Sequence, residues 1–107
     1  MGVMSLSPAT AYRRLNRLLW EGRLPAAHVT FIDDAVMPAN FGITLWDEDF
    51  VLPIIFINAS RKRWLKVLIH ECLHVAEPSL PHGKIFDSIV NSYTRRAKNE
   101  KKGYRTL

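Results

Sequence analysis

The chain has 107 residues, 48% of them hydrophobic and 23% charged, so it can build one hydrophobic core. We therefore expect a single domain over residues 1–107. The net charge of +5 favours acidic partners such as nucleic acid, although many soluble proteins without such partners carry a similar charge. The single cysteine, Cys72, excludes an internal disulfide.

Cysteine usage and the lack of a long apolar run indicate where the protein acts. A lone thiol is typical of a reducing compartment, so we expect a cytoplasmic, intracellular protein. The longest nearly apolar run, residues 50–57, is far shorter than the roughly 20 residues that cross a bilayer. No basic start leads into an apolar stretch, so we expect neither a membrane span nor a signal peptide. A compact chain of this kind would suit a phage or a mobile element.

The first predicted element is an amphipathic helix over residues 8–21. Ser7 is a good N-cap, and Pro8 is tolerated in the first turn of a helix. Apolar side chains recur at helical spacing and arginines fall mostly between them. Gly22 and Pro25 are expected to end the helix.

Three strand-like segments follow, at residues 28–32, 42–46 and 50–58, with polar turns between them. The third segment is an almost continuous apolar run, which suits a strand covered on both faces. Pro53 has no amide hydrogen to donate, so it marks an edge position or the start of the strand.

Two further helices complete the chain. Ser60 can cap a helix over about residues 61–77, which is apolar nearly all round, as a central buried helix would be. Pro78 ends it, and a short loop leads to a last helix over about residues 82–98. One helix, three strands and two more helices predict an α+β fold.

The central helix carries the motif with the strongest chemical meaning. His70-Glu71-Cys72-Leu73-His74 matches the pattern H-E-x-x-H. Residues four apart stand one turn above each other, so His70 and His74 can aim at one metal ion. Zinc prefers four ligands and accepts histidine nitrogens. Glu71 lies about 100° round the helix from His70, where it can reach a metal-bound water without binding the metal.

Short matches to this pattern arise by chance in many proteins, so its context matters. Two histidines and a glutamate in an otherwise apolar helix have no packing reason to be there, since burying them unpaired would be costly. His82 follows His74 by eight residues, across a helix stop and a short loop, as a returning third ligand requires. Glu77 is the alternative third ligand, because it lies on the same helix face as His70.

Several other residues could contribute to this site. Cys72 is expected to face the core as a small hydrophobe, and His28 to be an ordinary polar residue. Asp87 could orient a ligand histidine, with a solvent-exposed position on the helix as the alternative. Tyr93 or Arg95 could stabilise an oxyanion, with core packing and solvent exposure as the respective alternatives. The basic tail over residues 95–105 could contact nucleic acid or simply keep the chain soluble.

Three stretches, in this order, resemble the core of SprT-like metallopeptidases and related minimal zincins. They are Ile55-Phe56-Ile57-Asn58, His70-Glu71-Cys72-Leu73-His74 and His82-Gly83-Lys84-Ile85-Phe86. In that family a strand with its Asn leads into the active-site helix, and an H-G-x-x-F element supplies the third histidine. The resemblance covers roughly residues 40–95. It implies a minimal zincin core, with an N-terminal helix, a three-stranded sheet, an active-site helix and a C-terminal helix.

The resemblance also implies roles for individual residues. Zinc (Zn²⁺) would be held by His70, His74 and His82, and Glu71 would be the general base. The glycine and phenylalanine of the third stretch would be structural. Known relatives act on DNA-bound proteins, which agrees with the basic charge.

The leading hypothesis is a zinc metalloendopeptidase whose partner is a protein or peptide substrate. In zincins an edge strand can hold the substrate by backbone pairing, and residues 41–49 or 50–58 are the candidates here. The alternative is a catalytically inactive binding module, stabilised by zinc, that grips nucleic acid or a protein. A third interpretation is a zinc-free helical regulator with a chance motif.

Overall fold

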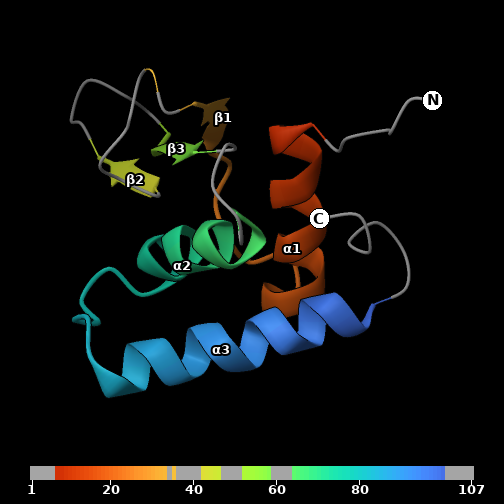
Figure 1. Cartoon of the computed structure of the whole chain (residues 1–107), viewed down its shortest axis with the longest axis vertical. Helices are drawn as coiled ribbons and strands as arrows, with labels where there is room; N and C mark the ends of the chain where they lie inside the picture. Colours follow the sequence, from red (N-terminus) through yellow and green to blue (C-terminus); the bar gives the residue numbers. More distant parts are fainter. Residues whose placement is uncertain (1–6, 34, 36–41, 47–51, 59–63, 101–107) are drawn as a thin grey trace.

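The computed structural model describes residues 7–33, 35, 42–46, 52–58 and 64–100, and in this part the chain forms three helices and a three-stranded sheet (Figure 1). In chain order the elements are α1 (Pro8–Trp20), β1 (His28–Ile32), β2 (Gly42–Leu45), β3 (Ile54–Asn58), α2 (Trp64–Ala76) and α3 (Lys84–Asn99). The expected α+β fold class is confirmed.

Helix α1 begins and ends within one residue of its predicted bounds. The backbone amide of Thr10 donates to the hydroxyl of Ser7 at 3.1 Å, so Ser7 caps the helix as expected. The chain leaves the helix through Glu21, which has a left-handed backbone with φ 55°, and then Gly22. One face of α1 is buried and consists of Ala11, Tyr12, Leu15, Leu19 and Trp20.

The sheet has the order β1-β3-β2, with β3 parallel to β1 and antiparallel to β2. Strand β3 is therefore central, and the prediction that residues 50–58 could be a substrate-holding edge strand is wrong. The most apolar segment takes the central position, where its buried side chains Ile55 and Ile57 lie under the helices. Pro53 directly precedes β3, and its carbonyl accepts a hydrogen bond from the amide of His28 at 2.9 Å. The other nominated segment, residues 41–49, contains β2, which is an edge strand of the described sheet.

The register of β2 decides which of its side chains face the helices. Ile55 and Ile57 of β3 are fully buried, and Thr44 and Gly42 lie directly opposite them on β2. Because opposite residues share a face of the sheet, Thr44 and Gly42 also face the helices. On the other face of β3, Ile54 and Phe56 are only partly buried, so the predicted coverage of both faces is not complete there.

Helix α2 is the centre of the molecule. It lies between the sheet and α3, with α1 packed across one side (Figure 1). Leu68, Ile69 and Cys72 on α2 are fully buried, so the prediction that Cys72 belongs to the core is confirmed. Burial raises the pKa of the Cys72 thiol. The helix ends at Ala76, one residue early, and its predicted start at residues 60–63 lies outside the described residues.

Helix α3 presents a buried stripe to the rest of the fold, formed by Phe86, Val90, Thr94 and Ala97. It begins at Lys84, two residues after the earliest predicted start, because His82 and Gly83 belong to the preceding loop. In the described part of the chain, no helix is long and apolar enough to cross a membrane.

Candidate metal centre

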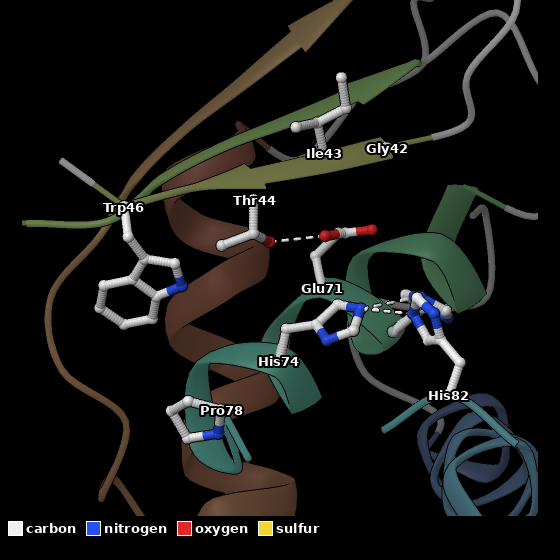
Figure 2. Close-up of a pocket in the computed structure, with 9 residues that line it drawn as sticks. Gly42, Ile43, Thr44, Trp46, Glu71, His74, Pro78 and His82 are labelled. Carbon is white, nitrogen blue, oxygen red and sulfur yellow. Dashed lines mark hydrogen bonds between the residues drawn. The ribbon is translucent and has the colours of Figure 1, made fainter. Parts of the chain in front are cut away.

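Two turns of α2 and the loop before α3 bring three imidazoles together. His70 and His74 stand one helical turn apart, and their Nε2 atoms are 3.1 Å from each other. The Nε2 atom of His82 lies 2.9 Å from that of His74. Figure 2 shows the rings of His74 and His82 directed toward one another from the two elements.

This set of nitrogens is close enough to hold a metal ion. One ligand atom from each histidine lies within 4.8 Å of the others. Two nitrogens bound at about 2.0–2.1 Å to one tetrahedral ion would be about 3.3 Å apart, near the separations found here. Three converging ring nitrogens cannot all satisfy one another by hydrogen bonds, whereas one cation accepts all three lone pairs. The donor set therefore fits a metal that prefers imidazole ligands.

The third histidine reaches the site because the chain turns back sharply after α2. The amide of Leu80 donates to the carbonyl of Glu77 at 3.0 Å, which closes the turn. Gly83 then has φ 152°, a backbone conformation that favours glycine, directly after His82. The side chain of Glu77, the alternative third ligand, is exposed and is not part of the three-residue ligand group.

Phe86 forms a common base under all three imidazoles. Its ring centroid lies 4.6 Å from that of His70, 4.7 Å from His74 and 5.1 Å from His82. Phe86 is fully buried, on the first turn of α3. The Phe86 ring therefore limits the rotation of three candidate ligands, which agrees with the structural role expected of Phe86.

The histidines of α2 are held in the neutral form that binds metals. The pKa of His70 is lowered to about 4, chiefly by burial and then by the neighbouring His74 and His82, while Asp87 acts in the opposite direction. The pKa of His74 is lowered by the same causes, burial first and then His82. At neutral pH both imidazoles offer a lone pair without first losing a proton.

Glu71 is buried beside the histidines and hydrogen-bonded to the sheet. Only 5% of its surface is exposed, and the hydroxyl of Thr44 donates to its Oε1 at 2.5 Å (Figure 2). Burial raises the pKa of the Glu71 carboxyl, whereas the Thr44 hydrogen bond and His82 act to lower it. A carboxylate with these neighbours can accept a proton from a water molecule at the site.

An open cleft of about 430 Å³ gives access to this cluster. Strand β2 and Trp46 form one wall, and the other wall consists of His70, Glu71 and His74 of α2 together with Pro78 and His82. In Figure 2, Trp46 and Pro78 lie at one end of the cleft and His82 at the other. Trp46 is 56% exposed, although it is a large apolar residue.

The remaining candidates do not line this cleft. Asp87 is exposed, but it shares a second, smaller hollow with His70, as a residue that orients this ligand would. Tyr93 packs edge-on against Trp20 with ring centroids 5.3 Å apart, Arg95 is exposed on α3, and neither lines the cleft. His28 is exposed on β1, away from the cleft wall.

Sequence reasoning did not find Thr44 or Gly42 as parts of the site. Both lie on β2 and face Glu71, which is 27 residues after Thr44 in the chain. Their alternate positions in a strand put them on one face, but nothing local to the strand indicates that this face meets Glu71. The contact follows from the packing of β2 on α2.

In comparisons with known proteins, no family model, no curated protein and no solved structure matches this chain. The resemblance to SprT-like metallopeptidases therefore stays a prediction from the sequence motifs. What the chain itself establishes is an α+β fold with three histidines placed closely enough to bind a metal ion.

Proposed function

We propose that this chain is a zinc-dependent metallopeptidase that hydrolyses peptide bonds. One observation carries the proposal: the buried carboxylate of Glu71 lies beside three convergent histidine nitrogens, at the wall of an open cleft. A purely structural metal site has no need for an additional buried acid that faces a cleft.

Zinc is the metal that this donor set suits best. Three imidazoles, from His70, His74 and His82, leave one position of a tetrahedral ion open, as in catalytic zinc sites. The described residues around the three nitrogens provide no further histidine, cysteine or acid in the ligand group. Zinc bound there would polarise the substrate carbonyl and lower the pKa of water toward about 7.

Glu71 carries out both proton transfers of the hydrolysis. Glu71 takes a proton from the attacking water as the water oxygen forms a bond to the carbonyl carbon of the substrate. When the carbon–nitrogen bond breaks, Glu71 delivers this proton to the leaving amine. Burial raises the pKa of Glu71, which makes its carboxylate a stronger base than an exposed glutamate.

Strand β2 supports a peptide substrate. It is an edge strand of the described sheet, and its residues form a wall of the cleft next to Glu71. An extended peptide can pair with such an edge through backbone hydrogen bonds, which recognise any sequence. We therefore place the scissile bond between β2 and the three histidines.

A second candidate function, binding of nucleic acid, is favoured by the distribution of charge. Exposed basic side chains line α1 and α3, namely Arg13, Arg14, Arg17, Lys84, Arg95, Arg96 and Lys98. Within the described ranges the only ion pair joins Arg23 to Glu21, so these seven side chains have no ion-pair partner there. Such groups can contact phosphates, either in a protease of nucleic-acid-associated proteins or in an inactive binding module.

The test is the substitution Glu71→Gln in protein purified with zinc. We expect zinc content to stay near one ion per chain, because the three imidazoles are untouched. Hydrolysis of fluorescein-labelled casein should fall by about 100-fold or more, since the amide cannot accept the proton. Glu77→Gln is the matched control, because Glu77 is exposed and outside the ligand group, and its activity should equal that of wild type.

Either of two results would contradict the proposed peptidase activity. Undiminished hydrolysis by Glu71→Gln would show that this carboxylate is not the base. A wild-type protein that binds zinc and nucleic acid, but releases no peptides in the presence of zinc, would favour the binding module.

A further inference from the structure

We infer that Thr44 is a positioning residue, which holds the Glu71 carboxylate in the orientation that proton transfer requires. The inference rests on the proposed function, because it takes Glu71 as the general base. It adds a residue on the sheet to a site whose other groups lie on α2 and in the loop before α3.

The hydrogen bond between Thr44 and Glu71 is short, and its donor lies on strand β2. The Thr44 hydroxyl donates to Oε1 of Glu71 at 2.5 Å, as short as hydrogen bonds between hydroxyls and ionised carboxylates become. Thr44 lies opposite the buried Ile55 in the ladder, so its side chain is turned toward α2. As a β-branched residue in a strand, it has few alternative rotamers.

A close approach of β2 to α2 keeps this bond in place. A Cβ atom at Gly42 would lie 2.7 Å from Cγ1 of Val67 and 3.3 Å from both Cγ and Oε2 of Glu71. Only a residue without a side chain therefore lets the strand pack directly on the helix at Glu71. The missing side chain at Gly42 leaves room for the Glu71 side chain, while Thr44 holds its Oε1 atom.

Orientation matters because a glutamate side chain has three rotatable bonds. Among the described side chains, Thr44 is the one that donates a hydrogen bond to the buried Glu71 carboxylate. A displacement of about 1 Å in a reacting group can cost on the order of 100-fold in rate. A base whose oxygen is held by a stiff hydroxyl on a strand avoids that loss.

The experiment compares Thr44→Val, which removes the hydroxyl at constant shape, with Thr44→Ser, which keeps it. For zinc-loaded protein and labelled casein, we expect Thr44→Val to lower kcat by about 10- to 100-fold with KM and zinc content nearly unchanged. Thr44→Ser should recover kcat to within about threefold of wild type. Thr30→Val is the control, because Thr30 is an exposed threonine on the opposite edge strand, β1.

A measurement that needs no activity tests the bond separately. Glu71→Met keeps the side-chain length and removes both oxygens. We expect Thr44→Val to lower the thermal midpoint by on the order of 5 °C in the otherwise wild-type protein. In the Glu71→Met background the same change should have little effect.

The outcomes separate this inference from the function on which it rests. Equal midpoint losses in both backgrounds, or full kcat in Thr44→Val while Glu71→Gln is inactive, would overturn the positioning role and leave the peptidase intact. Loss of zinc from Thr44→Val, or no recovery in Thr44→Ser, would also overturn it. The wild type could also hydrolyse nothing while the midpoint loss in Thr44→Val still depends on Glu71. In that case the proposed peptidase function fails, and so does the catalytic positioning role of Thr44.

Discussion

At the residue scale, some side chains of the site could be predicted from the sequence and others could not. His70 and His74 can be paired from sequence because a helix places residues four apart on one face. His82 could be nominated because a helix stop and a short loop separate it from His74. Thr44 could not be nominated, because its contact with Glu71 joins residues 27 apart on different elements. Local periodicity carries no information on such a contact.

The third ligand is tested by His82→Ala beside Glu77→Ala. His82 is exposed in a loop, yet its Nε2 lies 2.9 Å from that of His74, whereas Glu77 is outside the ligand group. We expect His82→Ala to weaken zinc binding by at least about 100-fold, because a three-ligand site becomes a two-ligand site. Glu77→Ala should bind zinc as wild type does. Competition with a chromophoric chelator measures both affinities.

A large loss in the glutamate variant with little change in the histidine variant would reverse the assignment. Equal zinc content of wild type and His82→Ala in elemental analysis would likewise contradict a role for His82.

At the element scale, the order of strands in space separates what was predicted from what was not. The sequence predicted three strands in the right order, because each is an apolar, β-branched segment bounded by polar turns, but the third begins at Ile54 and not at residue 50, since Pro53 cannot donate to the sheet. It did not predict that β3 inserts between β1 and β2, since the order along the chain does not fix the order in a sheet. This topology leaves β2 at an edge, next to the histidines.

The packing of β2 on α2 is tested by Gly42→Ala. The new Cβ would lie 2.7 Å from Cγ1 of Val67, so the strand or the helix has to move. We expect the free energy of unfolding to fall by about 1–3 kcal/mol, as for other overpacked contacts, with a lower urea midpoint. Combining Gly42→Ala with Val67→Ala removes the clashing methyl group, and the two losses should then sum to more than the loss in the double variant. Gly42→Ala with wild-type stability would mean that β2 does not pack this closely.

At the scale of the whole molecule, the candidate metal site links parts of the fold that otherwise meet through packing. Two ligands belong to the central helix, and the third belongs to the loop that leads into α3. Phe86 brings α3 beneath the same cluster. A bound ion would therefore stabilise the α2–α3 connection as well as serve chemistry, and its removal should lower the thermal midpoint.

The zinc-free protein should lose stability as the pH falls from about 6.5 toward 4. The pKa of His70 is lowered to about 4, so over this window the unfolded chain binds a proton that the folded chain does not, and acid favours unfolding. His74 contributes with the same sign, since its pKa is also lowered. The raised pKa of Glu71 acts in the opposite direction, because the folded state then binds the extra proton.

Urea unfolding of chelator-treated protein at pH 7 and pH 5 measures this effect, with His70→Asn as the comparison. The substitution removes the main titrating group and keeps Glu71, so its midpoint should depend less steeply on pH than that of wild type. If both proteins lose the same stability between the two pH values, His70 is not held neutral by the fold, and burial of the imidazole cluster would not explain its readiness to bind a metal.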